Sequence, residues 1–504
     1  MNVIERPAHN RPHFLALAVL ACLVLVGVIY GIDTLFAGPY GTHYIRQTDS
    51  LSFIAYFREY SIDPLAPGVL DLRNAPDGGR CAGEFPLVYW CIGMIERFSG
   101  PLPLLLKWLD LLSVLVGHAL LVRALCRVFN NELLAVGMGL LMFSSGVVAY
   151  YACNYLPDAF AYGLVLIGWS LVLPKLFAGE VVRNTWTTVA FVLAGLIKAP
   201  MAMHLLVWLI IPNIIQPYRC LDRTKDLFRS ALLLSAVASW HFYARWYNAE
   251  HGSDYFLTSA RPIWDLTMDE YRHVEDLVLR YWWTKYLHPT TWHVLALLVV
   301  VILARFQKFS SPVRSVLVLL ILATAAFLVL FFRKLADHDY YFLTVMPAIF
   351  WLFTAGFWSL SQLIRKRWAR IGITSLTWVL ALSAAVLART EVARRMSSGP
   401  DRFSGTAIAT KGLTEVIETL DLPKDSRVIV IGDSTTNGAL LSVGRLGWSF
   451  PGYPVTSVPD LVRLKEDGAS HVLYLGMSRD GIPISEVDGA IAAGPTWSLH
   501  DLNR

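Results

Sequence analysis

The stretch that decides the fold is 313–332, VRSVLVLLILATAAFLVLFF, which is followed at once by RKLADHDYY over 333–341. An apolar run of about 20 residues is long enough to cross the hydrocarbon core of a bilayer as a helix. Ionisable residues are costly inside lipid, so a cluster directly beyond such a run marks a site that is open to water. The two stretches together predict a membrane helix that ends at a functional site.

The same arrangement recurs along the chain, because carboxylate-bearing clusters border other apolar runs. The 504 residues are 55% hydrophobic and 16% charged, whereas a soluble domain carries about 25% charged residues. The fold class that we predict is therefore an α-helical polytopic membrane protein. The clusters are HYIRQTD at 43–49, EFPL at 84–87, PD at 157–158 and DHDYY at 337–341.

Apolar runs predict about 11 or more transmembrane helices. Their expected bounds are 14–31, 102–122, 132–152, 158–177, 185–200, 201–217, 228–246, 291–305, 313–332, 341–363 and 371–388. The run 85–98 is about 14 residues long, which is short for a span, so we expect it to lie in the outer interface or to be re-entrant.

Basic residues predict which loops face the cytoplasm. Alternate loops are rich in Arg and Lys, and by the positive-inside rule these loops and the amino terminus are cytoplasmic. The remaining loops and the carboxyl terminus then face outward, and they hold all four clusters. Because the net charge of +5 is small and follows this membrane pattern, we expect no nucleic-acid partner. The basic loops are 123–127, 175–183, 219–229, 305–314 and 365–370.

Hydropathy divides the chain into two domains. Residues 1–396 form the expected membrane core, and residues 397–504 form a small extracytoplasmic α/β domain, with strands at 427–432 and 471–476 and helices at 411–421 and 459–467. The stretch GDSTTNG at 432–438 is similar to the first block of GDSL-type hydrolases. No D-x-x-H motif follows to supply a base, and a capped strand-to-helix turn explains the stretch. The expected outer loops of the core are 32–101, 152–158, 247–290 and 333–340.

In this order the four clusters resemble the GT-C glycosyltransferases. The resemblance is to the bacterial branch related to protein O-mannosyltransferases, lipid A aminoarabinose transferase and rhizobial lipopolysaccharide galacturonosyltransferases. It implies a polyprenyl-phosphate sugar donor, a glycan, lipid or protein acceptor, and contact with membrane lipid. It also implies a bacterial inner-membrane enzyme with an extracytoplasmic active site, whose catalytic acidic residue in the first outer loop would be Asp49.

The chemistry of sugar transfer agrees with a catalytic role for Asp49. An acceptor hydroxyl needs a base, which a carboxylate can supply. A phosphate leaves without being protonated, so the pair of carboxylates that a glycosidase needs is not required, and direct attack inverts the anomeric carbon. Arg46 and Gln47 add a cation and an amide beside Asp49 as substrate-binding candidates. The alternative is that Asp49 only caps a helix.

Three outer cations are exceptions to the positive-inside pattern, namely Lys198, Arg333 and Lys334. A phosphate ligand would explain their position, and the alternative is binding of lipid headgroups or snorkelling. Glu84 is expected to support the first loop through Arg46 or to contact the acceptor.

The remaining substrate-binding candidates are expected to hydrogen-bond the sugar or the phosphate. They are Asp158, His338, Asp339 and Tyr340. Carboxylates also suit hard cations, so Asp49, Asp158 and Asp339 are candidate ligands of a divalent metal, although the sequence requires no cofactor.

Two other functions compete with sugar transfer. A lipid-linked glycan transporter is expected to have charges at mid-membrane and two related halves, but the apolar runs carry few charges and no repeat is found. A catalytically inactive glycan-binding membrane protein remains the second alternative.

Overall fold

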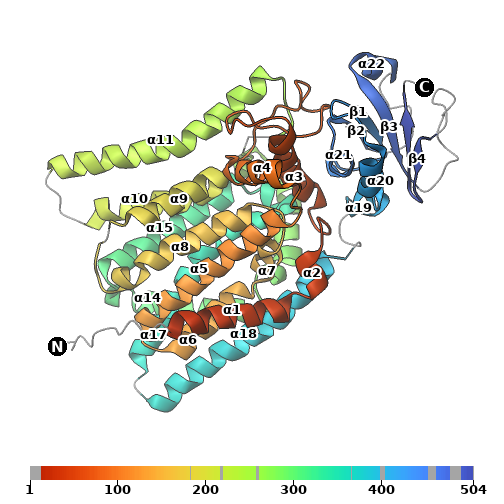
Figure 1. Cartoon of the computed structure of the whole chain (residues 1–504). Helices are drawn as coiled ribbons and strands as arrows, with labels where there is room; N and C mark the ends of the chain where they lie inside the picture. Colours follow the sequence, from red (N-terminus) through yellow and green to blue (C-terminus); the bar gives the residue numbers. More distant parts are fainter. Residues whose placement is uncertain are drawn as a thin grey trace.

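The computed structural model describes residues 13–181, 183–215, 220–256, 260–364, 366–397, 403–451, 461–476 and 490–502, and the statements below concern these residues. A bundle of long helices forms most of the molecule, and a small domain built on a five-stranded sheet lies at one end of it (Figure 1). The fold is therefore a helical membrane core with a small α/β domain, as predicted.

Each expected apolar run is helical over most of its described residues, and residues 216–217 of the expected run 201–217 lie outside the described residues. Five of the helices are long and apolar enough to cross a membrane, or seven if each bent pair is counted as one span, so the chain is a multi-pass membrane protein. The total of about eleven spans stays a prediction. The helices that follow the apolar runs are α1 (His13–Ile29), α5 (Leu105–Phe129), α6 (Glu132–Phe143), α7 (Gly146–Ala152), α8 (Asp158–Phe177), α9 (Thr185–Ile197), η1 (Ala199–Met201), α10 (Ala202–Ile215), α11 (Cys220–Glu250), α14 (Pro289–Ala304), α15 (Ser311–Leu330), α17 (Met346–Leu363) and α18 (Arg367–Arg395).

Small residues lie in the most extensive helix contact of the described bundle, between α5 and α8. A Cβ atom on Gly117 would lie 2.9 Å from the carbonyl oxygen of Gly163. A Cβ atom on Gly163 would lie 2.6 Å from the backbone of Ser113. Close approach through small residues is typical of helices that pack in a membrane. This contact places Asp158, at the start of α8, at the end of the bundle nearest the sheet domain.

Shorter elements cover that end of the bundle. The run predicted to be interfacial or re-entrant forms α4, which packs against α3. α3 begins at Tyr44, with His43 as its N-cap at φ 61°. Asp49 therefore lies in the second turn, and the structure excludes a capping role for it. These elements are α2 (Ile32–Phe36), α3 (Tyr44–Glu59), α4 (Leu87–Ser99), η2 (Ile263–Asp265), α12 (Met268–Asp276), η3 (Leu277–Trp282), α13 (Trp283–Tyr286), α16 (Lys334–Asp337) and η5 (Asp339–Thr344).

The carboxyl-terminal domain is a mixed sheet with helices. The strand order is β2-β1-β3-β5-β4, in which β1 pairs in parallel with β2 and β3, and β5 pairs antiparallel with β3 and β4. The apolar run 428–431 is buried, as expected of a central parallel strand. The elements are α19 (Ser404–Ala409), α20 (Leu413–Leu420), β1 (Arg427–Ile431), α21 (Gly438–Val443), β2 (Gly447–Phe450), α22 (Leu461–Glu466), β3 (Ala469–Leu475), β4 (Ala492–Ala493) and β5 (Trp497–Asp501).

The loop between α3 and α4 joins this domain through its backbone. The amide of Gly447 donates to the carbonyl of Leu70 at 3.0 Å, and the amide of Leu72 donates to the carbonyl of Gly447 at 2.6 Å. The loop thus pairs in parallel with the outer edge of β2. Leu70 packs against the core on one face of the sheet, and Leu72 packs against the core on the other. The domain is therefore fixed to the loop between α3 and α4.

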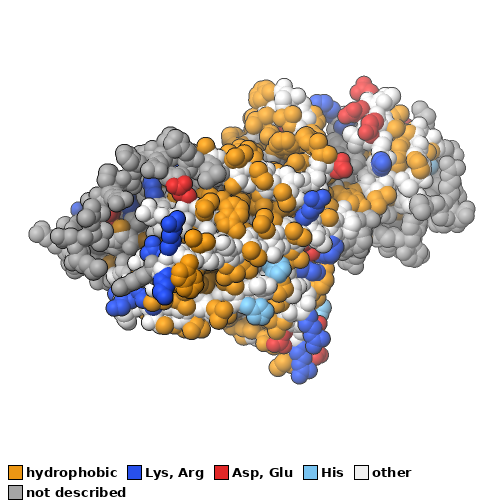
Figure 2. Space-filling model, turned by 90° about the horizontal axis from the view of Figure 1, so that it is seen from below, with side chains coloured by type: hydrophobic (Ala, Val, Ile, Leu, Met, Phe, Trp, Pro, Cys, Tyr) orange, Lys and Arg blue, Asp and Glu red, His pale blue; other side chains and the backbone are white. Residues whose placement is uncertain are grey.

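The surface of the bundle is mostly apolar in its middle, as a membrane protein requires. Hydrophobic side chains cover the middle of the face in Figure 2, and a group of Lys and Arg side chains lies toward the end away from the sheet domain. The apolar surface suits contact with lipid.

Candidate active site

The candidate site is built on one face of α3. Arg46, Asp49 and Ser52 recur at intervals of three, which places them along one side of the helix. Asp49 is only 5% exposed, and its Oδ2 lies 3.4 Å from Nη1 of Arg46. Its Oδ1 accepts hydrogen bonds from the Tyr255 hydroxyl and, at 3.1 Å, from Nδ2 of Asn437. Donors from three separate regions of the chain therefore surround this carboxylate.

A chain of ion pairs extends from α3 across the end of the bundle that lies nearest the sheet domain. Nη2 of Arg46 lies 2.9 Å from Oε1 of Glu84, which lies 3.3 Å from Nζ of Lys198. The same ammonium lies 2.8 Å from Oδ1 of Asp158. These residues come from α3, from the loop before α4, from the junction of α9 and η1, and from the first turn of α8. The structure thus brings together residues from three of the predicted clusters and one predicted outer cation.

The buried charges change the acidity of the groups in this network. Burial opposes ionisation of Glu84, but Arg46 and Lys198 outweigh it and lower the pKa of Glu84 to about 2. Burial also dominates at Asp49 and raises its pKa, although Arg46, Tyr255 and Asn437 each act to lower it. Glu84 is therefore a fixed anion, whereas Asp49 has the raised pKa that suits a general base.

A cavity of about 420 Å³ opens beside this network. Three cations face it, namely Arg46, Lys198 and Lys334, and Glu84 is the carboxylate among its described lining residues. Burial, together with the charges of His43, Arg46 and the two lysines, lowers the pKa of the adjacent His338 well below its usual value, so this ring is neutral. The apolar part of the wall comes from Leu196, Val237, Trp240, Phe256, Ala260 and Phe331.

Several buried polar atoms at the cavity have no hydrogen-bond partner in the described part of the chain. They include Nε of Arg46, Oε2 of Glu84 and Nδ1 of His338, and behind the cavity wall Oδ2 of Asp158 is also unpaired. Buried polar groups are normally paired, and an unpaired one calls for a ligand or water. The three cations and the apolar wall together suit a ligand that has an anionic head and an apolar tail.

Other predicted site residues lie at the edge of this cavity or away from it. Tyr340 lines it, and its ring centroid lies 5.0 Å from Nζ of Lys198. Gln47 does not line it, because both ends of its amide bind the backbone of residues 40–42. Arg333 points to Asp337, with Nη1 2.6 Å from Oδ2, and is also absent from the cavity wall.

Asp339 belongs to a separate buried ion pair. Its Oδ2 lies 2.6 Å from Nη2 of Arg395, and neither side chain is exposed. Its Oδ1 lies 2.9 Å from Nε2 of His43 and accepts from the Tyr151 hydroxyl. Asp339 therefore ties η5 to the end of α18 and to the residue that precedes α3.

The three carboxylates considered as metal ligands do not fit a shared metal. Asp49 binds Tyr255 and Asn437, Asp158 binds Lys198, and Asp339 binds Arg395. Among the described residues, no group of three or more His, Cys, Asp or Glu side chains is placed to hold an ion.

Tyr255 and Asn437, which contact Asp49, and Phe256, which contacts Arg46, are not predicted from the sequence. Tyr255 and Phe256 follow α11, and Phe256 lies under the guanidinium of Arg46 at 5.4 Å from its ring centroid. Asn437 is the penultimate residue of the stretch GDSTTNG, which is predicted from the sequence to be a capped turn. The signal available in the sequence was the concentration of polar side chains directly after a buried strand.

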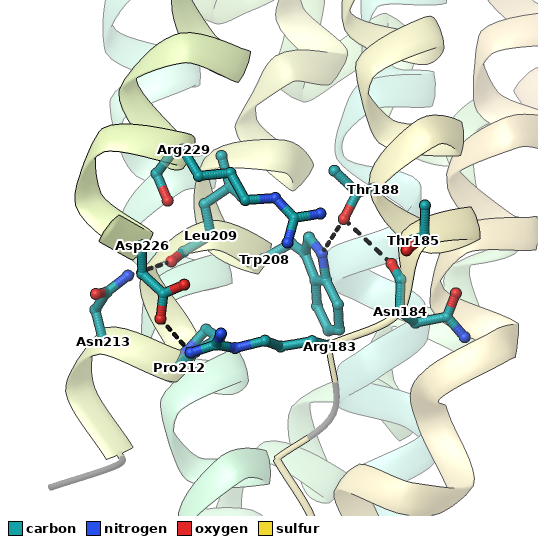
Figure 3. A pocket seen from close by; sticks show the side chains of 11 residues that line it. Arg183, Asn184, Thr185, Thr188, Trp208, Leu209, Pro212, Asn213, Asp226 and Arg229 are labelled. Carbon is teal, nitrogen blue, oxygen red and sulfur yellow. Dashed lines mark hydrogen bonds and ion pairs between the residues drawn. The ribbon is translucent and has the colours of Figure 1, made fainter. Parts of the chain in front are cut away.

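A second cavity, of about 60 Å³, lies at the opposite end of the helices. It is lined by the start of α9, the end of α10 and the first part of α11. Figure 3 shows the side chain of Arg183 reaching Asp226, with which it forms an ion pair, beside Trp208 and Arg229. These residues lie on the side predicted to be cytoplasmic, far from Asp49.

Comparison with known proteins gives matches among solved structures. No protein-family model matches the chain, and no curated protein matches it. ArnT from Cupriavidus metallidurans bound to undecaprenyl phosphate is similar over 97% of this chain and 97% of its own, with a TM-score of 0.59 and 13% identity.

Two further structures are similar over most of this chain. The archaeal oligosaccharyltransferase AglB from Archaeoglobus fulgidus, in complex with an inhibitory peptide and a dolichol-phosphate, matches over 92% of this chain and 69% of its own, with a TM-score of 0.53 and 12% identity. The arabinofuranosyltransferase AftD from Mycobacteria matches over 97% and 41%, with a TM-score of 0.51 and 14% identity. At these identities the shared property is the fold, and the chain has the fold of the GT-C glycosyltransferases.

Proposed function

We propose that the protein is a membrane glycosyltransferase that moves a sugar from a polyprenyl phosphate to a glycan, lipid or protein acceptor. The observation that carries the proposal is the convergence of Arg46, Lys198 and Lys334 on one partly apolar cavity beside Asp49. Undecaprenyl phosphate in ArnT and dolichol-phosphate in AglB are ligands of this chemical kind in proteins of the same fold.

The cavity is suited to the donor because one part of its wall is positively charged and another part is apolar. Guanidinium and ammonium groups form strong charge-assisted hydrogen bonds to phosphate. The apolar wall, with Val237, Trp240 and Phe331, suits the first isoprene units. Lys198 is held in place by Asp158 and Glu84, whereas Lys334 has no ion pair within the described residues and is the cation that is free to move toward the phosphate.

The proposed reaction is one direct displacement. Asp49 accepts the proton of the acceptor hydroxyl as that oxygen attacks the anomeric carbon. The bond from this carbon to the phosphate oxygen breaks, and the polyprenyl phosphate leaves with the electron pair. The configuration is inverted. Arg46 contacts both Asp49 and Glu84, so it joins the base to the phosphate site.

The proposal places the reaction on the outer face of a bacterial inner membrane. The core comprises residues 1–396, the extracytoplasmic domain comprises residues 397–504, and the site is formed by the outer loops of the core. The described loop ends that bear Asp49, Glu84, Lys198 and Lys334 meet at one end of the bundle, which supports a single site.

Two neighbouring cations provide a matched test of phosphate binding. Lys334 lines the cavity, whereas Arg333 pairs with Asp337 outside it. We expect Lys334→Gln to weaken binding of undecaprenyl phosphate about tenfold to a hundredfold, the value of a charge-assisted hydrogen bond. Arg333→Gln, which removes the same charge one residue away, should leave the affinity unchanged. Equal effects of the two substitutions would indicate non-specific attraction to lipid and contradict the proposal.

Sugar release separates the proposed transferase from its two alternatives. Purified protein is mixed with undecaprenyl phosphates that carry different radiolabelled sugars, in the presence of envelope extract as acceptor. Transfer of label to an acceptor is the expected result. Binding without release would indicate a glycan-binding protein, and movement of the intact donor across a vesicle membrane would indicate a transporter.

A further inference from the structure

The carboxylate of Asp49 is held in part by the carboxyl-terminal domain. Asn437 lies 388 positions away in the sequence, is fully buried, and donates from Nδ2 to Oδ1 of Asp49 at 3.1 Å. The same amide nitrogen lies 2.6 Å from the hydroxyl of Tyr255. Its Oδ1 accepts from Oγ of Ser52, one turn further along α3, at 2.9 Å. Both ends of the amide are therefore engaged around the catalytic carboxylate.

The loop that carries Asn437 is organised before it reaches α3. Asp433 accepts from the amide of Thr435 at 2.7 Å and from the amide of Ala439 at 3.0 Å, so it closes the loop across the start of α21. Oγ1 of Thr406 donates to the same carboxylate at 2.6 Å. A rigid loop can present a side chain at a defined position, which a mobile loop cannot.

The domain is also docked closely enough to fix the position of this loop. A Cβ atom on Gly438 would lie 2.6 Å from Oγ1 of Thr435 and 3.2 Å from Cε1 of Tyr44, so a side chain here would crowd the loop itself and its contact with α3. The backbone pairing of the first outer loop with β2 holds the other side of the domain. These contacts fix Asn437 relative to α3 from two directions.

From this geometry we infer that Asn437 is a positioning residue for the catalytic base, contributed by the carboxyl-terminal domain. With Tyr255, it occupies Oδ1 of Asp49. Oδ2 then contacts Arg46, which lines the cavity, and it is the oxygen that we assign to the acceptor hydroxyl. This inference rests on the proposed role of Asp49 as the base.

The hydrogen bonds to Oδ1 also affect the pKa of Asp49, and so the pH at which the proposed base is ionised. The ionisable groups that face Asp49 are Arg46 on its own helix, Glu84 and Cys81 in the following loop, and Tyr255 after α11. Burial raises the pKa of Asp49, and the hydrogen bonds from Tyr255 and Asn437 act against this shift. Removal of Asn437 would therefore raise the pKa further and leave less carboxylate at a given pH.

The test compares substitutions of Asn437 with one of Ser442 in the full-length protein. Asn437→Ala removes the donor, and Asn437→Asp keeps the shape and the hydrogen bond from Ser52 but turns a carboxylate oxygen toward Asp49. Ser442→Ala is the control, because it removes a side-chain hydrogen bond from α21 that is 3.3 Å long and does not reach Asp49. Transfer is measured from pH 4 to 9 with the undecaprenyl-phosphate sugar that the wild type uses.

We expect kcat of Asn437→Ala to fall about tenfold to a hundredfold near neutral pH, as for loss of a hydrogen bond to a charged group. The acidic limb of its pH profile should move to higher pH, and Asn437→Asp should move it further because like charges disfavour ionisation. The affinity for undecaprenyl phosphate should stay within about twofold, since Asn437 does not line the cavity. Ser442→Ala should match the wild type.

Infrared spectra give a second measurement that does not depend on turnover. The protonated carboxyl band of Asp49, identified by its loss in Asp49→Asn, should persist to higher pH in both Asn437 variants. An unshifted band and pH profile would overturn the inference even if the variants were less stable. If Asp49→Asn itself transferred sugar normally, the proposed function of Asp49 would fail instead, so the two failures are distinguishable.

Discussion

Replacing Asp49 with asparagine separates the chemical role of this residue from its packing. The asparagine keeps an oxygen that can accept from Tyr255 and Asn437, so the contacts at Oδ1 survive. The 3.4 Å contact of Oδ2 with Arg46 is lost, but Arg46 keeps its 2.9 Å pair with Glu84. Because burial makes the charged form of Asp49 costly, loss of the charge also removes a penalty, and we expect little change in stability.

The rate of transfer should change far more than the stability. General-base catalysis is worth about two to four orders of magnitude, so kcat of Asp49→Asn should fall by that factor. Affinity for undecaprenyl phosphate should not weaken, because a negative charge is removed near the phosphate site. Single-turnover release of radiolabelled sugar measures the first quantity, and titration with undecaprenyl phosphate in one detergent measures the second.

A matched control is available in the same outer loop. Asp63 is exposed and accepts a hydrogen bond from the amide of Leu65, so Asp63→Asn makes the same chemical change without touching the cavity. Near-normal turnover of Asp49→Asn, with Asp63→Asn also unchanged, would refute the assignment of the base. The wild-type rate should fall as the pH drops through the raised pKa of Asp49, because protonation removes the base.

Three further predictions follow from the buried charges and the topology. The ion pairs of Glu84 stabilise the fold fully above pH 4.5 and are lost as the pH falls toward 2. The free energy of unfolding of the wild type should therefore exceed that of Glu84→Gln above pH 4.5, and the two values should become equal toward pH 2. Arg395→Met leaves Asp339 buried without its guanidinium and should destabilise the protein by about 3–5 kcal/mol; adding Asp339→Asn should recover part of the loss in thermal unfolding. Reporter fusions should place residues 220–229, which were expected to be a loop but form the start of α11, in the cytoplasm and both 333–340 and the carboxyl terminus outside, and a cytoplasmic carboxyl terminus would contradict the single outer site.

The helical core could be predicted because the physics of the bilayer leaves a clear pattern in sequence. Long apolar runs gave the expected helices, and ionisable residues were conspicuous beside them. Asp49, Glu84, Asp158 and Lys198 were identified in this way. The ion pairs among these residues could not be predicted, because distances between residues in different loops depend on how the helices pack. One example is the close contact at Gly117 and Gly163.

The role of a polar residue was harder to predict than its presence near the site. Gln47 and Asp339 have the right chemistry to bind a sugar, but their hydrogen-bonding capacity is used within the protein. Lys334 and Arg333 are adjacent and equally charged, yet one faces the cavity and the other faces Asp337. Asn437 was overlooked because a polar turn after a strand is common and its partner lies 388 positions away.

The attachment of the carboxyl-terminal sheet to the first outer loop also determines the order in which the site is completed during synthesis. The ribosome makes Asp49 early, and Asn437 follows 388 residues later, which corresponds to a delay of about 20–80 s at 5–20 residues per second. Throughout this interval β2 has not been made, so residues 70–72 lack their strand partner, and α3 has its polar face uncovered. A nascent or prematurely terminated chain can therefore carry Asp49, Arg46 and Tyr255 and still lack Asn437, so the full set of contacts around the proposed base needs nearly the whole length of the polypeptide.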